Sequence, residues 1–200
     1  MLFDLHMHTA RYSPDSIIDP WELIEQAQTV GLNGIVITEH DRLWPEAELE
    51  ELRAKAPKLV ILAGVEITGR GGDMLCYGVS DLSNLKRGTA WRELTREVHR
   101  QGGVCVAAHP FRWGQPFDEL LTEEGVQIDG IEMMSNNMDA PLRKKADRFL
   151  ADHPDYTTLG NSDAHEIEVV GHCRTRFAVP VHGMPDLIAA IRNRQATPIS

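Results

Sequence analysis

Cysteine, positive charge and long apolar runs are all scarce in this 200-residue sequence, and each scarcity excludes a class of protein. The three cysteines, Cys76, Cys105 and Cys173, lie far apart and form no CxxC pair, so the sequence predicts neither a disulfide framework nor a thiolate zinc site. No segment approaches the ~20 apolar residues of a membrane-spanning helix. Lys and Arg number 20 against 30 Asp and Glu, and the net charge of −10 opposes binding to nucleic-acid backbones.

These absences favour a cytoplasmic protein with no signal peptide, no membrane contact and no nucleic-acid polymer as its partner. The composition, with 42% hydrophobic and 25% charged residues, is typical of a globular domain. No linker, repeat or break in composition divides the chain, so we expect residues 1–200 to form a single domain. The sequence gives no indication of the oligomeric state.

Short apolar runs alternate with amphipathic segments along the whole chain. The runs are too short for helices and predict strands at 1–7, 34–38, 59–64, 74–79, 103–108, 128–134, 157–160 and 175–180. The amphipathic segments predict helices at 20–30, 45–56, 89–102, 116–125, 140–153 and 184–195, the first of them capped by Asp19. This alternation favours an α/β fold with a parallel sheet covered by helices, although periodicity leaves open whether the sheet closes into a barrel.

A pair of histidines follows the first apolar run, in the segment DLHMHTARYSPDS. His6 and His8 are two residues apart, so in an extended chain their side chains point to the same side. A single buried imidazole is usually explained by a hydrogen bond to a backbone carbonyl. Two imidazoles that converge on one point favour binding of a metal ion.

Acidic and imidazole side chains also follow five other predicted strands. They are Glu39, His40 and Asp41 after 34–38, Glu66 after 59–64, His109 after 103–108, Glu132 near the end of 128–134, and Asp163 with His165 after 157–160. The carboxyl ends of parallel strands are where α/β proteins place their active sites. The set is larger than one tetrahedral ion requires, contains no thiolate, and suits two or more ions of Zn, Mn or Fe bridged by carboxylates such as Glu66 and Asp163.

In their order along residues 4–165, these motifs resemble those of the PHP (polymerase and histidinol phosphatase) metallophosphoesterases. DLHMHTARYSPDS is similar to the first motif of that family, ITEH to the second, GVEI to the third and NSDAH to the last, and AHPFR matches an intermediate histidine motif. The resemblance implies a distorted, TIM-like (β/α)7 barrel with two or three divalent metal ions at the carboxyl ends of its strands.

Carried over by position, the resemblance implies a set of metal ligands, namely His6, His8, Asp15, His40, Glu66, Asp73, His109, Asp163 and His165. Two positions depart from the family pattern. Asp73 stands near a position where many relatives have a histidine. Around the fifth barrel strand, where some relatives supply a further histidine, this chain has only Glu132 and Asn136. The third metal site is therefore where this chain departs most from the family pattern.

The implied activity is hydrolysis of a small-molecule phosphomonoester or phosphodiester by a metal-bound hydroxide, without a protein nucleophile. Arg112 is expected to clamp the phosphate and to act in catalysis. Arg11, Arg143 and Asn136 are further candidates for substrate binding, and His172 for protonating the leaving group. Asp4, Ser13 and Ser162 are expected to make hydrogen bonds that support the ligands.

Three other functions remain open from the sequence. An amidohydrolase-type barrel also begins with an HxH pair, although it is not expected to carry His40 and Glu66 at these places, and it would hydrolyse amides or lactones. A DNA-processing exonuclease would need a basic stripe with aromatic residues, which the sequence lacks. A noncatalytic metal-binding module would retain its ions and turn over no phosphoester.

Overall fold

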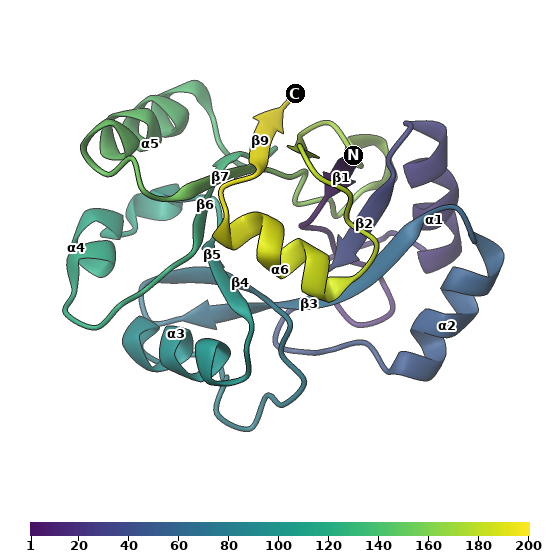
Figure 1. The fold of residues 1–200 in the computed structure, drawn as a ribbon, viewed down its shortest axis with the longest axis horizontal. Coiled ribbons are helices and arrows are strands. Elements are labelled where there is room, and N and C mark those ends of the chain that lie inside the picture. The colour runs from purple at the N-terminus through teal and green to yellow at the C-terminus, as the bar shows by residue number, and fades with distance from the viewer.

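A computed structural model describes residues 1–200 and consists of one nine-stranded mixed sheet wrapped by helices (Figure 1). The order of the strands in the sheet is β7-β6-β5-β4-β3-β2-β1-β8-β9. The strands are β1 (Leu2–Asp4), β2 (Gly34–Ile37), β3 (Val60–Gly69), β4 (Gly72–Tyr77), β5 (Val104–Ala107), β6 (Gly130–Met134), β7 (Thr157–Gly160), β8 (Arg174–Phe177) and β9 (Ala196–Ile199).

All six predicted helices form. They are α1 (Pro20–Thr29), α2 (Glu46–Lys55), α3 (Trp91–Arg100), α4 (Phe117–Thr122), α5 (Ala140–Asp152) and α6 (Met184–Arg192), joined by the short 3₁₀ turns η1 (Arg112–Gly114) and η2 (Ile167–Val169). Asp19 caps α1 as predicted, because its carboxylate accepts hydrogen bonds from the backbone N–H groups of Trp21 and Glu22.

The sheet is mixed, which corrects the expectation of a parallel sheet. β4 runs antiparallel to both of its neighbours, β3 and β5. Only Arg70 and Gly71 separate β3 from β4, and a connection of two residues makes a hairpin but cannot make a parallel crossover. β8 and β9 add a second antiparallel pair beside β1. β9 was not predicted because it is four residues long and contains Pro198.

The sheet closes almost completely into a barrel, as the resemblance implied. Beyond the ends of β1 and β7, the chain forms a parallel bridge between Met7 and Ala164, and the backbone N–H of His8 donates to the Ala164 carbonyl at 2.9 Å. Below that bridge, Thr175 of β8 donates its hydroxyl to the carbonyl of Gly160 in β7. Residues far apart in sequence therefore meet at the upper rim, where the predicted ligands lie.

One end of the barrel is filled by α6, which lies across the front of the sheet in Figure 1. Leu187, Ala190 and Ile191 of this helix belong to one apolar cluster with inward-facing strand residues such as Leu75 and Val106. Thr157, at the start of β7, donates its hydroxyl to the Ile191 carbonyl at 2.5 Å. Because α6 covers the amino-terminal ends of the parallel strands, only the opposite end is free to hold a polar site.

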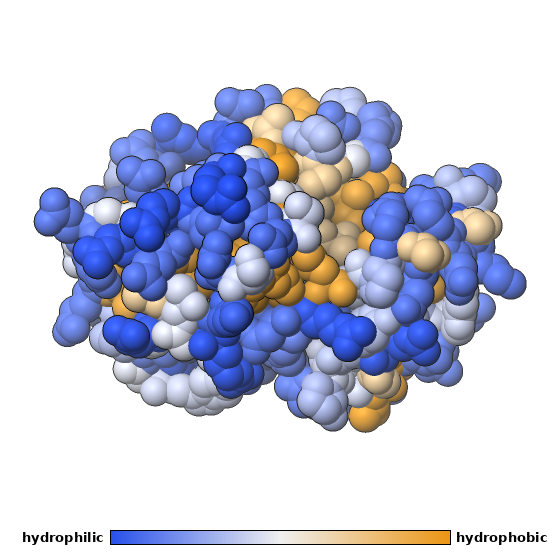
Figure 2. Space-filling model, turned by 90° about the horizontal axis from the view of Figure 1, so that it is seen from below, coloured by the Kyte–Doolittle hydropathy of each residue, from blue (hydrophilic) through white to orange (hydrophobic).

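The outward faces of the strands are covered by the other helices, in two further apolar clusters. The view in Figure 2 shows a mostly hydrophilic surface with apolar atoms in a band across its middle. None of the helices has the length and apolar composition that crossing a membrane would require.

Candidate metal centre

The two histidines of the first motif lie just beyond β1 and are fully buried. Neither His6 nor His8 has any exposed surface, and their Nε2 atoms are 3.1 Å apart. Met7, between them, points the other way into an apolar cluster and pairs with Ala164. The period-two alternation of the extended chain therefore turns both imidazoles to the barrel axis, as the sequence predicted.

Two buried carboxylates stand at the centre of the cluster. Asp163 Oδ1 lies 3.2 Å from His6 Nε2 and 3.3 Å from His8 Nε2. Glu66 approaches the same two nitrogen atoms at 3.4 Å and 3.3 Å. Glu66 and Asp163 come from β3 and from the loop after β7, on opposite sides of the barrel, so closure of the sheet is what brings them together.

His109 and Asp73 extend the cluster on the side of β4 and β5. His109 Nε2 lies 3.1 Å from Glu66 Oε1, 3.7 Å from Asp163 Oδ2 and 4.0 Å from Asp73 Oδ2. The backbone of His109 has φ of 26°, an unusual conformation for a residue with a side chain. Such strain is typical of functional sites and here turns the chain away from β5 into the pocket wall.

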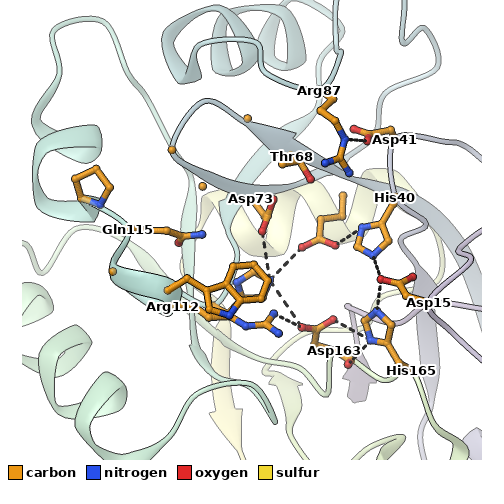
Figure 3. A pocket seen from close by; sticks show the side chains of 18 of the residues that line it. Asp15, His40, Asp41, Thr68, Asp73, Arg87, Arg112, Gln115, Asp163 and His165 are labelled. Atoms are coloured by element: carbon orange, nitrogen blue, oxygen red, sulfur yellow. Dashed lines mark hydrogen bonds and ion pairs between the residues drawn. The ribbon is translucent and has the colours of Figure 1, made fainter.

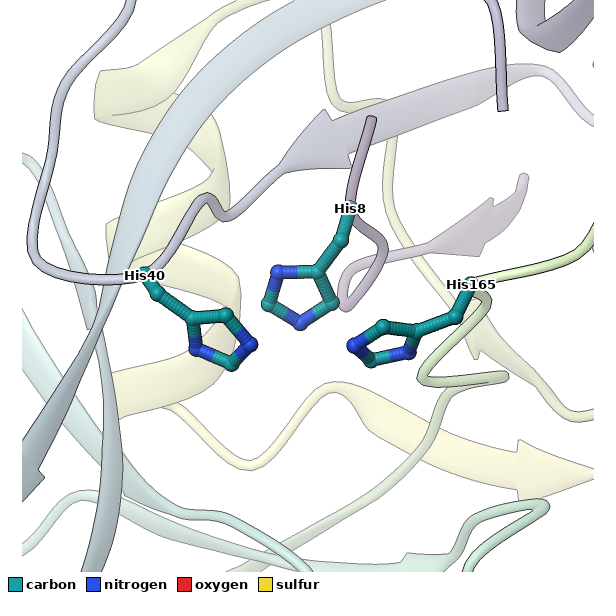
Figure 4. Close-up of side chains that lie close together, drawn as sticks. All are labelled: His8, His40 and His165. Carbon is teal, nitrogen blue, oxygen red and sulfur yellow. The ribbon is translucent and has the colours of Figure 1, made fainter. Parts of the chain in front are cut away.

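A third group forms nearer the solvent around His8. His40 and His165 lie on either side of its ring, with ring centroids 4.2 and 4.4 Å away, and Figure 4 shows the three imidazoles converging. Asp15, 56% exposed at its side chain, bridges the outer pair, with its Oδ2 3.1 Å from His40 Nε2 and 3.5 Å from His165 Nε2.

Opposite charges in the cluster shift the pKa values of their neighbours in the direction that favours the charged forms. Burial opposes the charged form of His6, but Asp163, Glu66 and Glu132 together raise its pKa well above the ordinary value. Burial likewise opposes ionisation of Glu66, yet the neighbouring His6, His109 and His40 hold the pKa of this carboxyl well below its usual range. Glu66 and Asp15 raise the pKa of His40 to about 9 against the effect of burial. The site thus stabilises positive charge at its centre.

The donors present fit divalent metal ions. They form overlapping groups whose nitrogen and oxygen atoms lie within 4.8 Å of one another, namely His6–His8–Glu66, His6–His109–Asp163, Glu66–Asp73–His109 and His8–His40–His165. Two buried imidazole nitrogens, His109 Nδ1 and His40 Nδ1, and the buried Asp163 Oδ1 make no hydrogen bond. His40 Nδ1 lies 2.9 Å from Glu66 Oε2 without hydrogen-bond geometry. Imidazole and carboxylate donors without thiolate suit Zn, Mn or Fe.

Buried side chains that hydrogen-bond to the predicted ligands fix the orientation of the imidazole rings. Glu132 accepts from the Nδ1 of His6 at 3.1 Å and from the backbone N–H of His109 at 2.9 Å, so one carboxylate orients two predicted ligands. Asp4 was expected to orient an imidazole. Instead it accepts hydrogen bonds from the backbone N–H groups of His6, Ser162 and Gly171, and so links the segment after β1 to the segment after β7.

A pocket of about 860 Å³ opens directly above the cluster (Figure 3). Arg112 lines it, with a terminal nitrogen 3.6 Å from Asp163 Oδ2, and its guanidinium points toward the cluster. Across the pocket, Arg87 donates to Asp41 at 3.2 Å. Trp113 forms part of the rim with 77% of its surface exposed, and the Arg112 guanidinium stacks on its ring.

Three predicted residues take positions away from this pocket, and a fourth, Asn136, lies in the hollow that adjoins it. Arg11 pairs with Glu48 at 3.0 Å on the outer surface, and Arg143 donates to the backbone carbonyls of Met138 and Ser135, which occupies its guanidinium in holding the loop after β6. His172 is exposed and does not line the pocket, so its position gives no support to a role in proton transfer. Asn136 lines a neighbouring hollow shared with Arg112.

Several residues of the site were missed from the sequence. Asn137, not Asn136, donates its side-chain amide to Asp163 Oδ2. Arg87 and Trp113 reach the pocket from loops whose course depends on the fold. Glu39 was noted after strand 34–38 as one of the acidic residues at strand ends, but the sequence assigned it no specific role.

The sequence matches two family models. Residues 4–127 match the model of the PHP domain, and residues 143–196 match that of a PHP-associated C-terminal region. Among curated proteins, a protein of uncharacterised function from Methanocaldococcus jannaschii is 26% identical over 147 residues, which cover 68% of this chain and 82% of the relative.

Solved structures share the fold at lower identity. A two-domain protein from Bacteroides vulgatus, containing a predicted PHP-like metal-dependent phosphoesterase, has a TM-score of 0.77 at 23% identity, and the match covers 100% of this chain but 64% of that protein. The lesion-specific endonuclease EndoQ from Pyrococcus furiosus gives 0.72 at 20% identity, covering 96% and 56%. An amidohydrolase from Chromobacterium violaceum, with bound sulfate, gives 0.70 at 17% identity, covering 96% of each chain.

Proposed function

The chain belongs to the PHP domain family, and we propose that it is a metal-dependent phosphoesterase acting on a small-molecule phosphoester. One observation carries the proposal. Imidazoles and carboxylates from six separate segments converge in groups whose donor atoms lie within 4.8 Å of one another, and the guanidinium of Arg112 faces them from the pocket wall. Cations beside an anion-binding arginine match the charge and the oxygen geometry of a phosphoryl group.

Two or three divalent ions would be held by these residues, and Glu66 and Asp163 each lie near enough to several imidazoles to serve more than one ion. His6, His8 and His109 would hold the inner ions, and His40, His165 and Asp15 the outer one, with Asp73 at the far side. Bound divalent cations would acidify a water molecule, which then serves as the nucleophile, and would offset the charge on the phosphoryl oxygens. The chain itself fixes the ligand directions through Glu132 and Asn137.

Arg112 holds the substrate phosphate in this proposal. Its guanidinium is 23% exposed, is steadied by the ring of Trp113 and lies beside Asp163, so it can contact ligand oxygens without leaving its place. A planar guanidinium matches two phosphoryl oxygens at once and stabilises charge that develops during bond cleavage. No serine or cysteine lines the pocket, and the hydroxyl group in its lining is that of Thr68.

The size and charge of the molecule favour a small substrate. A pocket of about 860 Å³ falls in the range of small-molecule sites, and the net charge of −10 opposes a long polyanion. The similarity in fold to an endonuclease makes DNA cleavage the second candidate, and the exposed Trp113 could stack against a base.

The test is release of the phenol from an aryl phosphomonoester and from the matching diester by protein loaded with Mn²⁺ or Zn²⁺. We expect turnover of at least one ester and a loss of about a hundredfold or more in the His8→Ala variant, because a ligand is removed. His182→Ala, which changes an exposed histidine far from the pocket, is the matched control. Cleavage of single-stranded DNA or of an amide or lactone, with no phenol released from either aryl ester, would overturn the proposal.

A further inference from the structure

His6 and His8 both turn Nε2 toward the centre, but their Nδ1 atoms face chemically different partners. His6 Nδ1 faces the Glu132 carboxylate, whereas His8 Nδ1 lies 3.3 Å from the hydroxyl oxygen of Ser13. A carboxylate can only accept a hydrogen bond, so His6 must carry its proton on Nδ1. A hydroxyl can either donate or accept, so Ser13 alone leaves the tautomer of His8 undecided.

Glu39 decides it. The Ser13 hydroxyl lies 2.5 Å from Glu39 Oε2, and its single proton must point there because a carboxylate has none to give. Ser13 Oγ then offers only lone pairs to its other neighbours, His8 Nδ1 and the backbone N–H of His40 at 3.3 Å. His8 must therefore donate from Nδ1, which leaves a free lone pair on Nε2.

Glu39 is itself held so that it cannot turn away. It is fully buried, and it accepts from the Thr9 backbone N–H at 3.1 Å, from the Thr9 hydroxyl at 2.5 Å and from Trp44 Nε1 at 2.8 Å, besides Ser13. Four donors around two oxygens match a carboxylate. A glutamine amide in either orientation would set its NH₂ against the N–H of Trp44 or of Thr9.

We propose that Ser13 and Glu39 are positioning residues that fix the Nδ1–H tautomer of His8, so that its Nε2 is ready to bind a metal ion. This inference rests on the metal centre of the proposed function and adds to it the two groups that prepare His8. Glu39 acts through Ser13, and neither touches the substrate pocket. His6 has its own partner and does not depend on this pair.

The experiment measures the affinity of the full chain for Zn²⁺ by competition with a chelator. Ser13→Ala removes the acceptor of His8 Nδ1, and we expect its Zn²⁺ dissociation constant to rise about ten- to a hundredfold, as is usual when the outer partner of a metal-bound histidine is lost. Glu39→Gln should act in the same direction. Ser16→Ala is the control, because Ser16 Oγ donates to the backbone carbonyl of His8 at 2.9 Å and not to its ring.

A second readout separates positioning from general packing. In the ¹⁵N spectrum of the Zn²⁺-loaded protein, we expect His8 to carry its proton on Nδ1, and Ser13→Ala to move that signal while the His6 signals stay in place. The inference is overturned if Ser13→Ala binds Zn²⁺ as tightly as the wild type, or if Ser16→Ala weakens binding equally. It is also overturned if His8 is protonated on Nε2 in the wild type. A wild-type protein that takes up no metal would instead refute the proposed function.

Discussion

Among single residues, Glu66 contacts both the inner and the outer histidines of the centre. Its carboxylate lies within 3.4 Å of a nitrogen atom of His6, His8, His40 and His109, four histidines from three segments of the barrel. A charge this deeply buried is tolerated only with compensating partners. In the proposed centre, its position between the inner and outer histidines would let it contact ions on both sides.

Arg112 provides the most direct test of substrate binding at this scale. Arg112→Ala removes a charge-assisted contact to the phosphate, a loss of roughly 1.5–3 kcal/mol, so KM should rise about ten- to a hundredfold. Metal content should stay unchanged, because Arg112 offers no donor to a cation. Steady-state kinetics with the aryl ester measures the effect. Arg194→Ala, which breaks an exposed pair with Asp155 far from the pocket, should leave KM unaltered, and equal effects in both variants would count against the phosphate clamp.

Single residues also show how far the sequence could go. His6 and His8 were predictable because alternation along an extended chain fixes their common direction. Asn137 and Asn136 could not be told apart, since the turn after β6 decides which amide meets Asp163. Arg11, Arg143 and His172 were proposed from charge and proximity in sequence, and neither property determines where a flexible side chain finds its partner.

At the scale of the elements, β1 and β2 pack more tightly than their composition suggests. Phe3 and Gly34 are cross-strand partners, and the ring of Phe3 lies over the space above the glycine. A Cβ atom at Gly34 would come within 2.1 Å of Phe3 Cε1, so no side chain fits without displacing the ring. The position of β1 relative to β2 depends on this contact. Because His6 follows β1 in the chain, its position along the barrel axis depends on the same contact.

Gly34→Ala should therefore lower the free energy of unfolding by roughly 1–3 kcal/mol, the usual cost of overpacking a core. Urea denaturation of the metal-free protein measures it. Gly183→Ala is the matched control, because its Cβ would lie 3.7 Å from Pro185 Cδ, an ordinary contact. Wild-type stability in Gly34→Ala would mean that the Phe3 ring has room to move.

The elements themselves were largely predictable. Each of the six helices and the first eight strands lies where apolar periodicity and the terminal residues predicted, with ends shifted by a few positions. The prediction that β4 runs parallel to its neighbours was wrong. The apolar pattern of a strand covered on both faces is the same in parallel and antiparallel sheets. The two-residue connection through Arg70 and Gly71 was the signal that could have shown the hairpin.

In the molecule as a whole, the apolar core and the candidate metal centre occupy opposite ends of the barrel. α6 and the inward-facing apolar residues fill one end of the barrel, and the other end holds a cluster of charged and imidazole groups that destabilises the fold unless each group finds a partner. Sequence alone could place these groups at strand ends but could not show the closure between Met7 and Ala164 that gathers them.

Metal binding should consequently stabilise the entire fold. At a free metal concentration of 100 times the dissociation constant, the gain is about 2.7 kcal/mol, which corresponds to about 5–10 °C in Tm for a chain of this size. Removing the metal with a chelator should lower Tm by this amount, as followed by calorimetry. His8→Ala should show a smaller shift, and an identical shift in both proteins would place the bound ions elsewhere.

The central claim is that residues from opposite sides of the barrel hold divalent ions jointly. Elemental analysis of the purified wild type beside the Asp163→Asn variant tests it most directly, because Asp163 Oδ1 lies beside both inner histidines and would serve as their shared carboxylate ligand. We predict at least two equivalents of Zn, Mn or Fe per wild-type chain and a loss of at least one in the variant. A wild-type protein that holds no such ion after incubation with each metal, or a variant that holds the same number, would contradict the account.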